Sequence, residues 1–288
     1  MAVTFQGCGM MALEFICLSI DKRMQEERGA MGNNLNQRGC QLGPQANPRG
    51  SIWDVLVIIF LSMAVVPTSV AILLDWLCEA GIVAIPTDSL RHIKMISLVS
   101  AQEAALFILT LGSMASTGWR LGDLRLFSRR WWWDVSWGMG FGFCFVGINW
   151  VGEYVSRLLF SLFMEESRVL AILSRENSVA NQLMSREQAP WVRISMAILV
   201  IFVAPIVEEA FFRGYAYNIF KARLGTAQAL FISSLLFAGV HMYLIHFLPV
   251  FLLGFLLALL YEWRQTLLTP IMAHGVMNLL VAMALHYF

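Results

Sequence analysis

The chain has 288 residues, of which 58% are hydrophobic and 14% are charged, and its mean hydropathy is +0.67. Soluble domains contain about half apolar and a quarter charged residues, so this composition excludes an ordinary soluble protein and indicates an integral membrane protein. The net charge of +1 provides no broad basic field, which argues against a nucleic-acid-binding protein. The five cysteines include no Cys-x-x-Cys pair, and their odd number argues against a disulfide framework.

The first 50 residues differ in character from the rest of the chain. Residues 1–20 lack a basic stretch and contain Glu14 within an apolar run, so they do not fit a secretory signal peptide. An interfacial amphipathic helix is the alternative interpretation. Residues 21–50 are polar and rich in Gly, Asn and Gln, which is typical of a flexible extension without a core. We therefore treat residues 1–50 as an N-terminal extension.

Runs of about twenty mostly apolar residues, the length of helix that crosses a bilayer, recur from Trp53 onward. We expect an all-α, polytopic transmembrane bundle of about seven spans, within a range of about six to eight. The predicted spans are 53–76, 93–117, 132–154, 191–220, 227–245, 248–263 and 267–287. Residues 51–189 then form an N-terminal membrane region with an amphipathic segment, and residues 190–288 form a C-terminal membrane core.

Three further stretches give expectations about packing and about the membrane surface. The stretch 156–189 is mixed in charge and has helical periodicity, which predicts a surface or interfacial amphipathic helix. The tryptophan run at 131–133 is typical of an interfacial anchor, and the Gly-rich stretch 138–143 predicts close packing between helices. Lys and Arg are concentrated in the loops on the side of the N-terminus, which predicts that the N-terminus is cytoplasmic.

The fourth predicted span contains charged residues in the middle of an apolar sequence: Glu208, Glu209 and Arg213. We expect one continuous helix over 192–221, because about 45 Å of helix can cross a bilayer when tilted. Pro205 removes a backbone donor and predicts a kink in this helix. The charges then lie at membrane depth, where each costs a few kcal/mol and usually marks a functional site.

Four polar side chains on three helices reach overlapping depths when residues are counted from the loops on one side. Glu208 and His241 both lie roughly 24 Å along their helices from the turn at Gly225, and His274 and Asn278 lie roughly 14 and 20 Å along theirs. A chance distribution of polar residues would not be expected to match in this way. We therefore predict one polar site inside the membrane.

The spacing of these residues suggests chemistry. Glu209 and Arg213 lie four residues apart, in the order that favours an ion pair, which leaves Glu208 for another task. A carboxylate and an imidazole, Glu208 and His241, can hold and deprotonate a water molecule. A second His and an Asn amide, His274 and Asn278, can donate hydrogen bonds to the oxyanion that forms when water attacks a carbonyl.

Three motifs in this region resemble those of the CAAX-protease and bacteriocin-processing (CPBP, Rce1-type or ABI) family of intramembrane proteases. They are EEAFFR at 208–213, FAGVH at 237–241 and HGVMN at 274–278. The resemblance covers roughly residues 190–288, and residues 1–190 carry no motif of this kind. It implies that the C-terminal core is a catalytic core.

The resemblance also implies roles for individual residues. Glu208 and His241 would activate the water, and His274 and Asn278 would stabilise the oxyanion. The supporting residues would be Glu209 and Arg213, which shape the site, and Phe237, which packs within its motif. The family's metal dependence is disputed. Glu208, His241 and His274 could together bind Zn²⁺, but Asn is an unusual zinc ligand and the chain has no His-Glu-x-x-His motif, which favours a metal-free site.

Several interpretations of the sequence stay open. The main hypothesis is an endopeptidase acting on a membrane-associated peptide, either a prenylated CAAX-type tail or a bacteriocin-type leader peptide. The alternatives are a non-proteolytic scaffold or immunity protein of the same fold, and a proton-coupled transporter, although the sequence shows no repeated halves. The location would be the cell (inner) membrane if the source is bacterial. Glu103 on the second span either lines the same cavity or caps a water pocket, and His246 and His286 are interpreted as interfacial.

Overall fold

The structure is a computed structural model, and it describes residues 49–83, 87–184 and 188–287. The expected interfacial helix at the N-terminus, and nearly all of the 1–50 extension, lie outside these described residues. Within them, the chain is entirely helical apart from its loops, and no strand occurs. The prediction of an all-α bundle is therefore confirmed.

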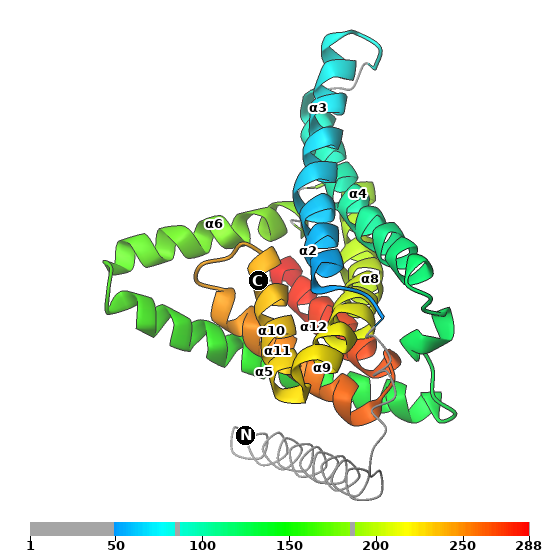
Figure 1. Cartoon of the computed structure of the whole chain (residues 1–288). Coiled ribbons are helices and arrows are strands. Elements are labelled where there is room, and N and C mark those ends of the chain that lie inside the picture. Colours follow the sequence, from blue (N-terminus) through cyan, green and yellow to red (C-terminus); the bar gives the residue numbers. More distant parts are fainter. Residues whose placement is uncertain (1–48, 84–86, 185–187, 288) are drawn as a thin grey trace, which may run out of the picture.

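The N-terminal membrane region consists of three long helical segments. The first is continuous over Ile52–Glu79 and comprises α2 (Ile52–Phe60), the π-helical η1 (Leu61–Val65) and α3 (Val66–Glu79). Ser51 caps it, since its side chain accepts from the backbone N–H of Trp53. The others are α4 (Thr87–Ser116) and α5 (Trp131–Ser161), which are separated by the short 3₁₀-helix η2 (Leu121–Leu124). Figure 1 shows α3 and the adjoining part of α4 projecting beyond the other helices.

The predicted amphipathic stretch 156–189 is divided between two helices. Its first residues complete α5, and most of the rest form α6 (Glu166–Met184), which extends to one side of the bundle (Figure 1). Val169 and Leu173 of α6 are buried against Ile245, while several neighbouring α6 side chains are exposed. The helix therefore uses its apolar stripe to pack on the loop that follows α10.

The fourth span is one continuous helix over Pro190–Leu224, as expected from the sequence. It contains α7 (Pro190–Ile198), η3 (Leu199–Val203), α8 (Ala204–Glu209), η4 (Ala210–Ala216) and α9 (Tyr217–Leu224). Both η segments are π-helical. The first ends two residues before Pro205, so the irregularity expected at the proline takes the form of a π segment. Such segments are frequent at functional sites.

The last three helices are α10 (Thr226–Val240), α11 (Phe247–Arg264) and α12 (Leu268–Tyr287). The fifth predicted span, 227–245, was too long, because α10 ends at Val240 and residues 241–246 form a loop. Five helices of the described chain are long and apolar enough to cross a membrane, whereas Thr226–Val240 and Leu268–Ala284 are shorter apolar helices. A polytopic membrane protein is confirmed, while the fifth predicted span is shorter than expected.

The closest helix packing joins α5 to α12, and glycine makes it possible. A Cβ atom on Gly138 would lie 2.7 Å from the backbone oxygen of Thr269, and one on Gly142 would lie 2.8 Å from that of Ala273. Any larger residue would push the helices apart. This contact holds α12, which carries His274, in place against α5, as expected for the Gly-rich stretch 138–143.

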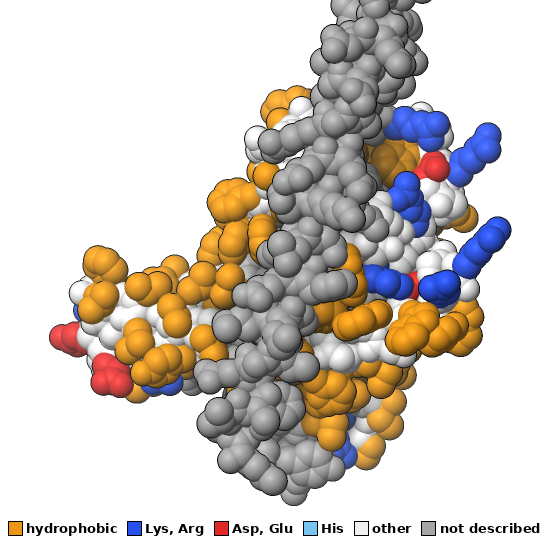
Figure 2. Space-filling model, turned by 90° about the horizontal axis from the view of Figure 1, so that it is seen from below, with side chains coloured by type: hydrophobic (Ala, Val, Ile, Leu, Met, Phe, Trp, Pro, Cys, Tyr) orange, Lys and Arg blue, Asp and Glu red, His pale blue; other side chains and the backbone are white. Residues whose placement is uncertain are grey.

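The surface reflects an apolar environment. Hydrophobic side chains cover much of the face in Figure 2 that is not hidden by grey atoms, and Lys and Arg side chains gather at one side of it. The segment between α4 and α5 carries exposed Arg120, Arg125, Arg129 and Arg130. The tryptophans at 131–133, which follow directly, are also exposed, with between 43% and 57% of their surface accessible. This arrangement agrees with an anchor at a membrane interface.

Candidate active site

A cavity of about 640 Å³ lies among the helices that carry the sequence motifs. Its wall includes Glu208 on α8, His241 after α10, and both His274 and Asn278 on α12. These are the four residues predicted to form one site, and the structure brings them together in a single cavity. Phe237, from the second motif, also lines it.

Glu209 faces the protein core, not the cavity, and it organises the surrounding polar groups. Its Oε1 accepts a hydrogen bond from Nη1 of Arg213 at 2.8 Å and lies 3.0 Å from Nδ1 of His274. Nη2 of Arg213 donates to the backbone oxygen of Gly254 at 2.8 Å. Glu209 and Arg213 are almost completely buried, with 0% and 1% of their side-chain surface exposed. The expected ion pair therefore exists, and it also joins α8 to α11 and α12.

This contact fixes the proton on His274. Because Glu209 is paired with a guanidinium, it acts as a carboxylate that accepts, so Nδ1 of His274 donates to it. The other ring nitrogen, Nε2, is then the one available for chemistry. His274 can donate a hydrogen bond through Nε2 only when both ring nitrogens carry protons.

Phe237 is completely buried and separates the charged groups of the site. Its ring centroid lies 4.5 Å from Cζ of Arg213, a cation–π distance, and 4.9 Å and 5.9 Å from the rings of His241 and His274. A single aromatic ring thus sets the spacing between two imidazoles and a guanidinium. Its expected packing role agrees with this position.

His241 is held by its own helix. It follows the last residue of α10, and its Nδ1 lies 2.7 Å from the backbone oxygen of Phe237. A carbonyl oxygen only accepts, so Nδ1 carries the proton and Nε2 keeps a lone pair. A neutral imidazole with this tautomer can accept a proton or orient a water molecule.

Glu208 differs from its neighbour Glu209. It lines the cavity, which Glu209 does not, and its Oε2, like the Oε2 of Glu209, is buried without a hydrogen-bond partner among the residues that the structure describes. A buried carboxylate oxygen without a partner is uncommon, and it usually indicates a functional group or a water site. Glu208 can therefore accept a hydrogen bond from a water molecule or ligand in the cavity.

Asn278 is anchored to the π-helical segment η3. Its Nδ2 donates to the backbone oxygen of Val200 at 2.8 Å. The close approach depends on Gly275, where a Cβ atom would lie 2.9 Å from the backbone oxygen of Ile201. One of the two amide hydrogens is thus used for packing, which leaves the second for a ligand.

The structure adds residues that the sequence did not assign to this site. Glu153, Glu176, Tyr243 and His246 line the same cavity. His246 was interpreted as interfacial, but it lies in the cavity wall, with Nδ1 2.7 Å from Oε2 of Glu176 and Nε2 3.7 Å from Oε2 of Glu153. No local signal identified Glu176, because it lies 70 residues from His246 on another helix.

Glu176 fixes the loop that carries the second motif's histidine. Its carboxylate accepts from the backbone N–H groups of Leu244, Ile245 and His246 at 2.6, 3.1 and 3.1 Å. Burial alone would raise the pKa of Glu176, but these bonds and the one from the His246 ring hold it below the ordinary value of 4.5. Burial alone would lower the pKa of His246, but its two carboxylate partners keep it above 6.5. Both Glu176 and His246 are therefore charged around pH 6.

Of the two interpretations of Glu103, the structure favours the first. This α4 residue is only 4% exposed and lines the same cavity as Glu208.

The side chains considered as zinc ligands do not form a metal site in this arrangement. Over the described residues, no group of three or more His, Cys, Asp or Glu side chains is placed to hold one metal ion. The donor set of Glu208, His241 and His274 therefore does not fit a bound ion, and no step below depends on one.

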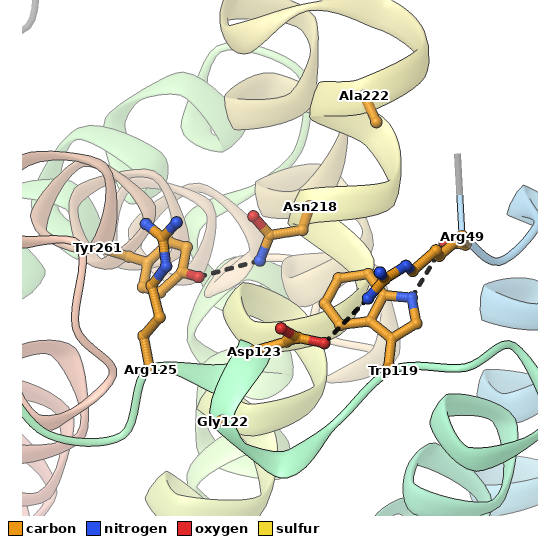
Figure 3. Close-up of a pocket in the computed structure, with 8 residues that line it drawn as sticks. All are labelled: Arg49, Trp119, Gly122, Asp123, Arg125, Asn218, Ala222 and Tyr261. Carbon is orange, nitrogen blue, oxygen red and sulfur yellow. Dashed lines mark hydrogen bonds and ion pairs between the residues drawn. The ribbon is translucent and has the colours of Figure 1, made fainter. Parts of the chain in front are cut away.

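A second pocket, of about 360 Å³, lies near η2 and α9 (Figure 3). Its charged and amide groups satisfy one another: Nη1 of Arg49 lies 3.2 Å from Oδ2 of Asp123, and Nδ2 of Asn218 donates to the hydroxyl of Tyr261 at 2.9 Å. It offers no unpartnered acid or base, so we assign it a structural role.

Residues 190–280 match a protein-family model described as type II CAAX prenyl endopeptidase, Rce1-like. The matched segment includes all three motifs and every predicted site residue, and it confirms the resemblance drawn from them. Comparison with curated proteins and with solved structures found no match.

Proposed function

We propose that this chain, whose residues 190–280 belong to the Rce1-like family, is an intramembrane endopeptidase that hydrolyses a peptide bond of a membrane-associated peptide or protein. The observation that carries the proposal is the convergence of Glu208, His241, His274 and Asn278 on one cavity. Of these, Glu208 is the acid with a buried oxygen that lacks a partner in the described part of the chain.

In the proposed reaction, water is activated first. The Glu208 carboxylate takes a proton from a water molecule that also donates a hydrogen bond to Nε2 of His241. The oxygen of this water then attacks the carbonyl carbon of the peptide bond. General-base catalysis of this kind contributes about 10²- to 10⁴-fold to a rate.

The negative charge that develops on the carbonyl oxygen is stabilised by hydrogen-bond donors. Nε2 of doubly protonated His274 and the second amide hydrogen of Asn278 supply them, and both side chains are already oriented by Glu209 and by the Val200 carbonyl. Donors fixed before the reaction stabilise an oxyanion without reorganisation. The proton held by Glu208 then passes to the leaving nitrogen as the C–N bond breaks.

The cavity wall favours a substrate that is partly apolar. Besides the polar residues above, it contains Met63, Val99, Val146, Trp150 and Met196. A peptide with a lipid attached near its C-terminus offers both a scissile amide and an apolar chain. We therefore propose a prenylated CAAX-type tail as the first substrate class, with bacteriocin-type leader peptides as the second.

The test uses the purified protein in lipid vesicles, with a farnesylated CAAX peptide, the same peptide without the lipid, and a leader peptide. Mass spectrometry identifies the bond cleaved. We expect cleavage of the farnesylated peptide and none with Glu208→Gln. Cleavage of no peptide by the parent protein would contradict the proposal. In that case, peptide binding by the parent that survives in Glu208→Gln would favour the scaffold. Proton flux across sealed vesicles that Glu208→Gln abolishes would favour the transporter.

We also place the protein in a cell membrane with a cytoplasmic N-terminus, because exposed arginines occur between α4 and α5 on the predicted inner side.

A further inference from the structure

One buried carboxyl group has no role in the mechanism above. Glu103 lies in α4, outside the segment matched by the family model. Its side chain is only 4% exposed, and its Oε2 is buried with no hydrogen-bond partner in the described ranges. A buried polar atom without a partner requires an explanation.

Glu103 faces the same cavity as Glu208. Both residues belong to its wall, and α4 packs directly against α8 and the η4 segment that follows. The two carboxyl groups are close enough for the charge of Glu208 to act on Glu103. Each has a buried Oε2 without a partner in the part of the chain described.

Two carboxylates in one buried cavity cannot both stay ionised at low cost, because each charge loses its hydration and repels the other. One proton shared by the pair removes the repulsion and supplies a donor where both groups lack one.

We propose that Glu103 is a positioning residue for Glu208: it holds a proton at neutral pH and donates it as a hydrogen bond to Glu208, directly or through one water molecule. Glu208 is thereby kept as the charged base. Glu103 keeps its proton throughout the reaction, and the proton taken from water is carried by Glu208 alone.

The choice of which carboxyl group holds the proton follows from the surroundings. Glu208 lies five residues before the cationic Arg213 on the same continuous helix, and it shares the cavity wall with His241 and His274. Near Glu103, the α4 wall residues are Val99 and the uncharged Gln102. The cavity has four other titratable groups: Glu153, Glu176, Tyr243 and His246. The carboxylates of Glu153 and Glu176 are paired with His246. The charged form is therefore better stabilised at Glu208.

This inference rests on the proposed function only for its effect on catalysis, so its first test does not use activity. A protonated carboxyl group gives an infrared C=O stretching band that a carboxylate lacks. We expect the parent protein in vesicles at pH 7 to show such a band, and Glu103→Gln to lose it. Glu153→Gln is the matched control, because it removes a carboxylate from the same cavity, and it should keep the band. A band unchanged in Glu103→Gln would overturn the proposal.

The second test is the pH dependence of peptide cleavage. Glu103→Leu removes the donor, so the acid limb of the profile should shift upward by about one pH unit. Glu103→Gln keeps a donor and should restore the limb to its position in the parent. Identical limbs in the parent and Glu103→Leu would contradict the positioning role. If Glu208→Gln cleaved normally, the proposed function would fail, whereas the infrared result would stand.

Discussion

Nδ1 of His274 lies 3.0 Å from Oε1 of Glu209, across 65 residues of sequence, and the same oxygen accepts Nη1 of Arg213 at 2.8 Å. One carboxylate thus fixes both the ring orientation of a cavity histidine and a buried guanidinium. The neighbouring Glu208 instead lines the cavity, where its buried Oε2 has no hydrogen-bond partner inside the described structure. In the proposed reaction, the two adjacent glutamates have different tasks, one structural and one chemical.

The contrast between the two glutamates predicts different effects on stability. Glu209→Gln leaves the buried Arg213 without its anionic partner, and breaking a buried ion pair in this way costs about 3–5 kcal/mol. Glu208→Gln removes a charge whose Oε2 has no partner, so it should leave stability unchanged or raise it. Thermal unfolding in detergent checks both. Equal melting temperatures for the two variants would contradict the assignment.

The α5–α12 contact predicts the effect of a single methyl group. Gly142→Ala places a Cβ atom 2.7 Å from Cβ of Val276 and 2.8 Å from the Ala273 oxygen, and such overpacking costs about 1–3 kcal/mol. Because His274 follows Ala273, peptide cleavage should fall as well. Gly140→Ala is the control, since nothing lies within 4 Å of its Cβ position. Unfolding temperature and cleavage rate are measured for both, and similar losses in the two variants would refute the contact's role.

The loop after α10 should depend on pH. The pKa of Glu176 is lowered in the fold, so its stabilisation is present above pH 4.5 and is lost as the pH falls through the folded pKa. The pKa of His246 is raised, so its stabilisation is complete below pH 6.5 and is lost as the pH rises through the folded pKa. Hydrogen exchange at Leu244, Ile245 and His246, corrected for intrinsic rates, should therefore be slowest between pH 4.5 and 6.5.

A variant separates the Glu176 contacts from general effects of pH. Glu176→Gln weakens hydrogen bonds to a charged group, each worth about 1.5–3 kcal/mol, so exchange at these amides should accelerate by about tenfold or more. Glu166→Gln, at the exposed start of the same helix, should leave the exchange rates unchanged. Unchanged protection in Glu176→Gln would show that α6 does not hold the loop.

Much of the fold follows from local patterns. Each of the seven predicted spans coincides with a helix of the described residues, and five of these helices are long and apolar enough to cross a membrane. Helical spacing located the Glu209–Arg213 pair. The early end of α10 was missed, because the loop HMYLIH is itself largely apolar and periodicity alone does not show where the helix stops. The π-helical segments also have no sequence signature of this kind.

Only those site residues could be predicted whose helical spacing, or whose depth in the membrane, can be counted from the sequence. Glu208, His241, His274 and Asn278 share a depth, which can be counted from the loops. Glu176 and His246 meet through the docking of α6 on the 241–246 loop, a tertiary contact that no single segment encodes. The buried position of Glu103 likewise depends on the packing of α4 against α8.

The central claim is that Glu208 activates water for peptide hydrolysis. The most direct measurement is kcat/KM for a farnesylated CAAX peptide in vesicles that contain the parent protein, Glu208→Gln, or Glu79→Gln as an exposed control on α3. We predict that Glu208→Gln lowers kcat/KM by about 10²- to 10⁴-fold while it unfolds at the parent's temperature or above it, and that Glu79→Gln matches the parent. Cleavage by Glu208→Gln at the parent's rate would contradict the account.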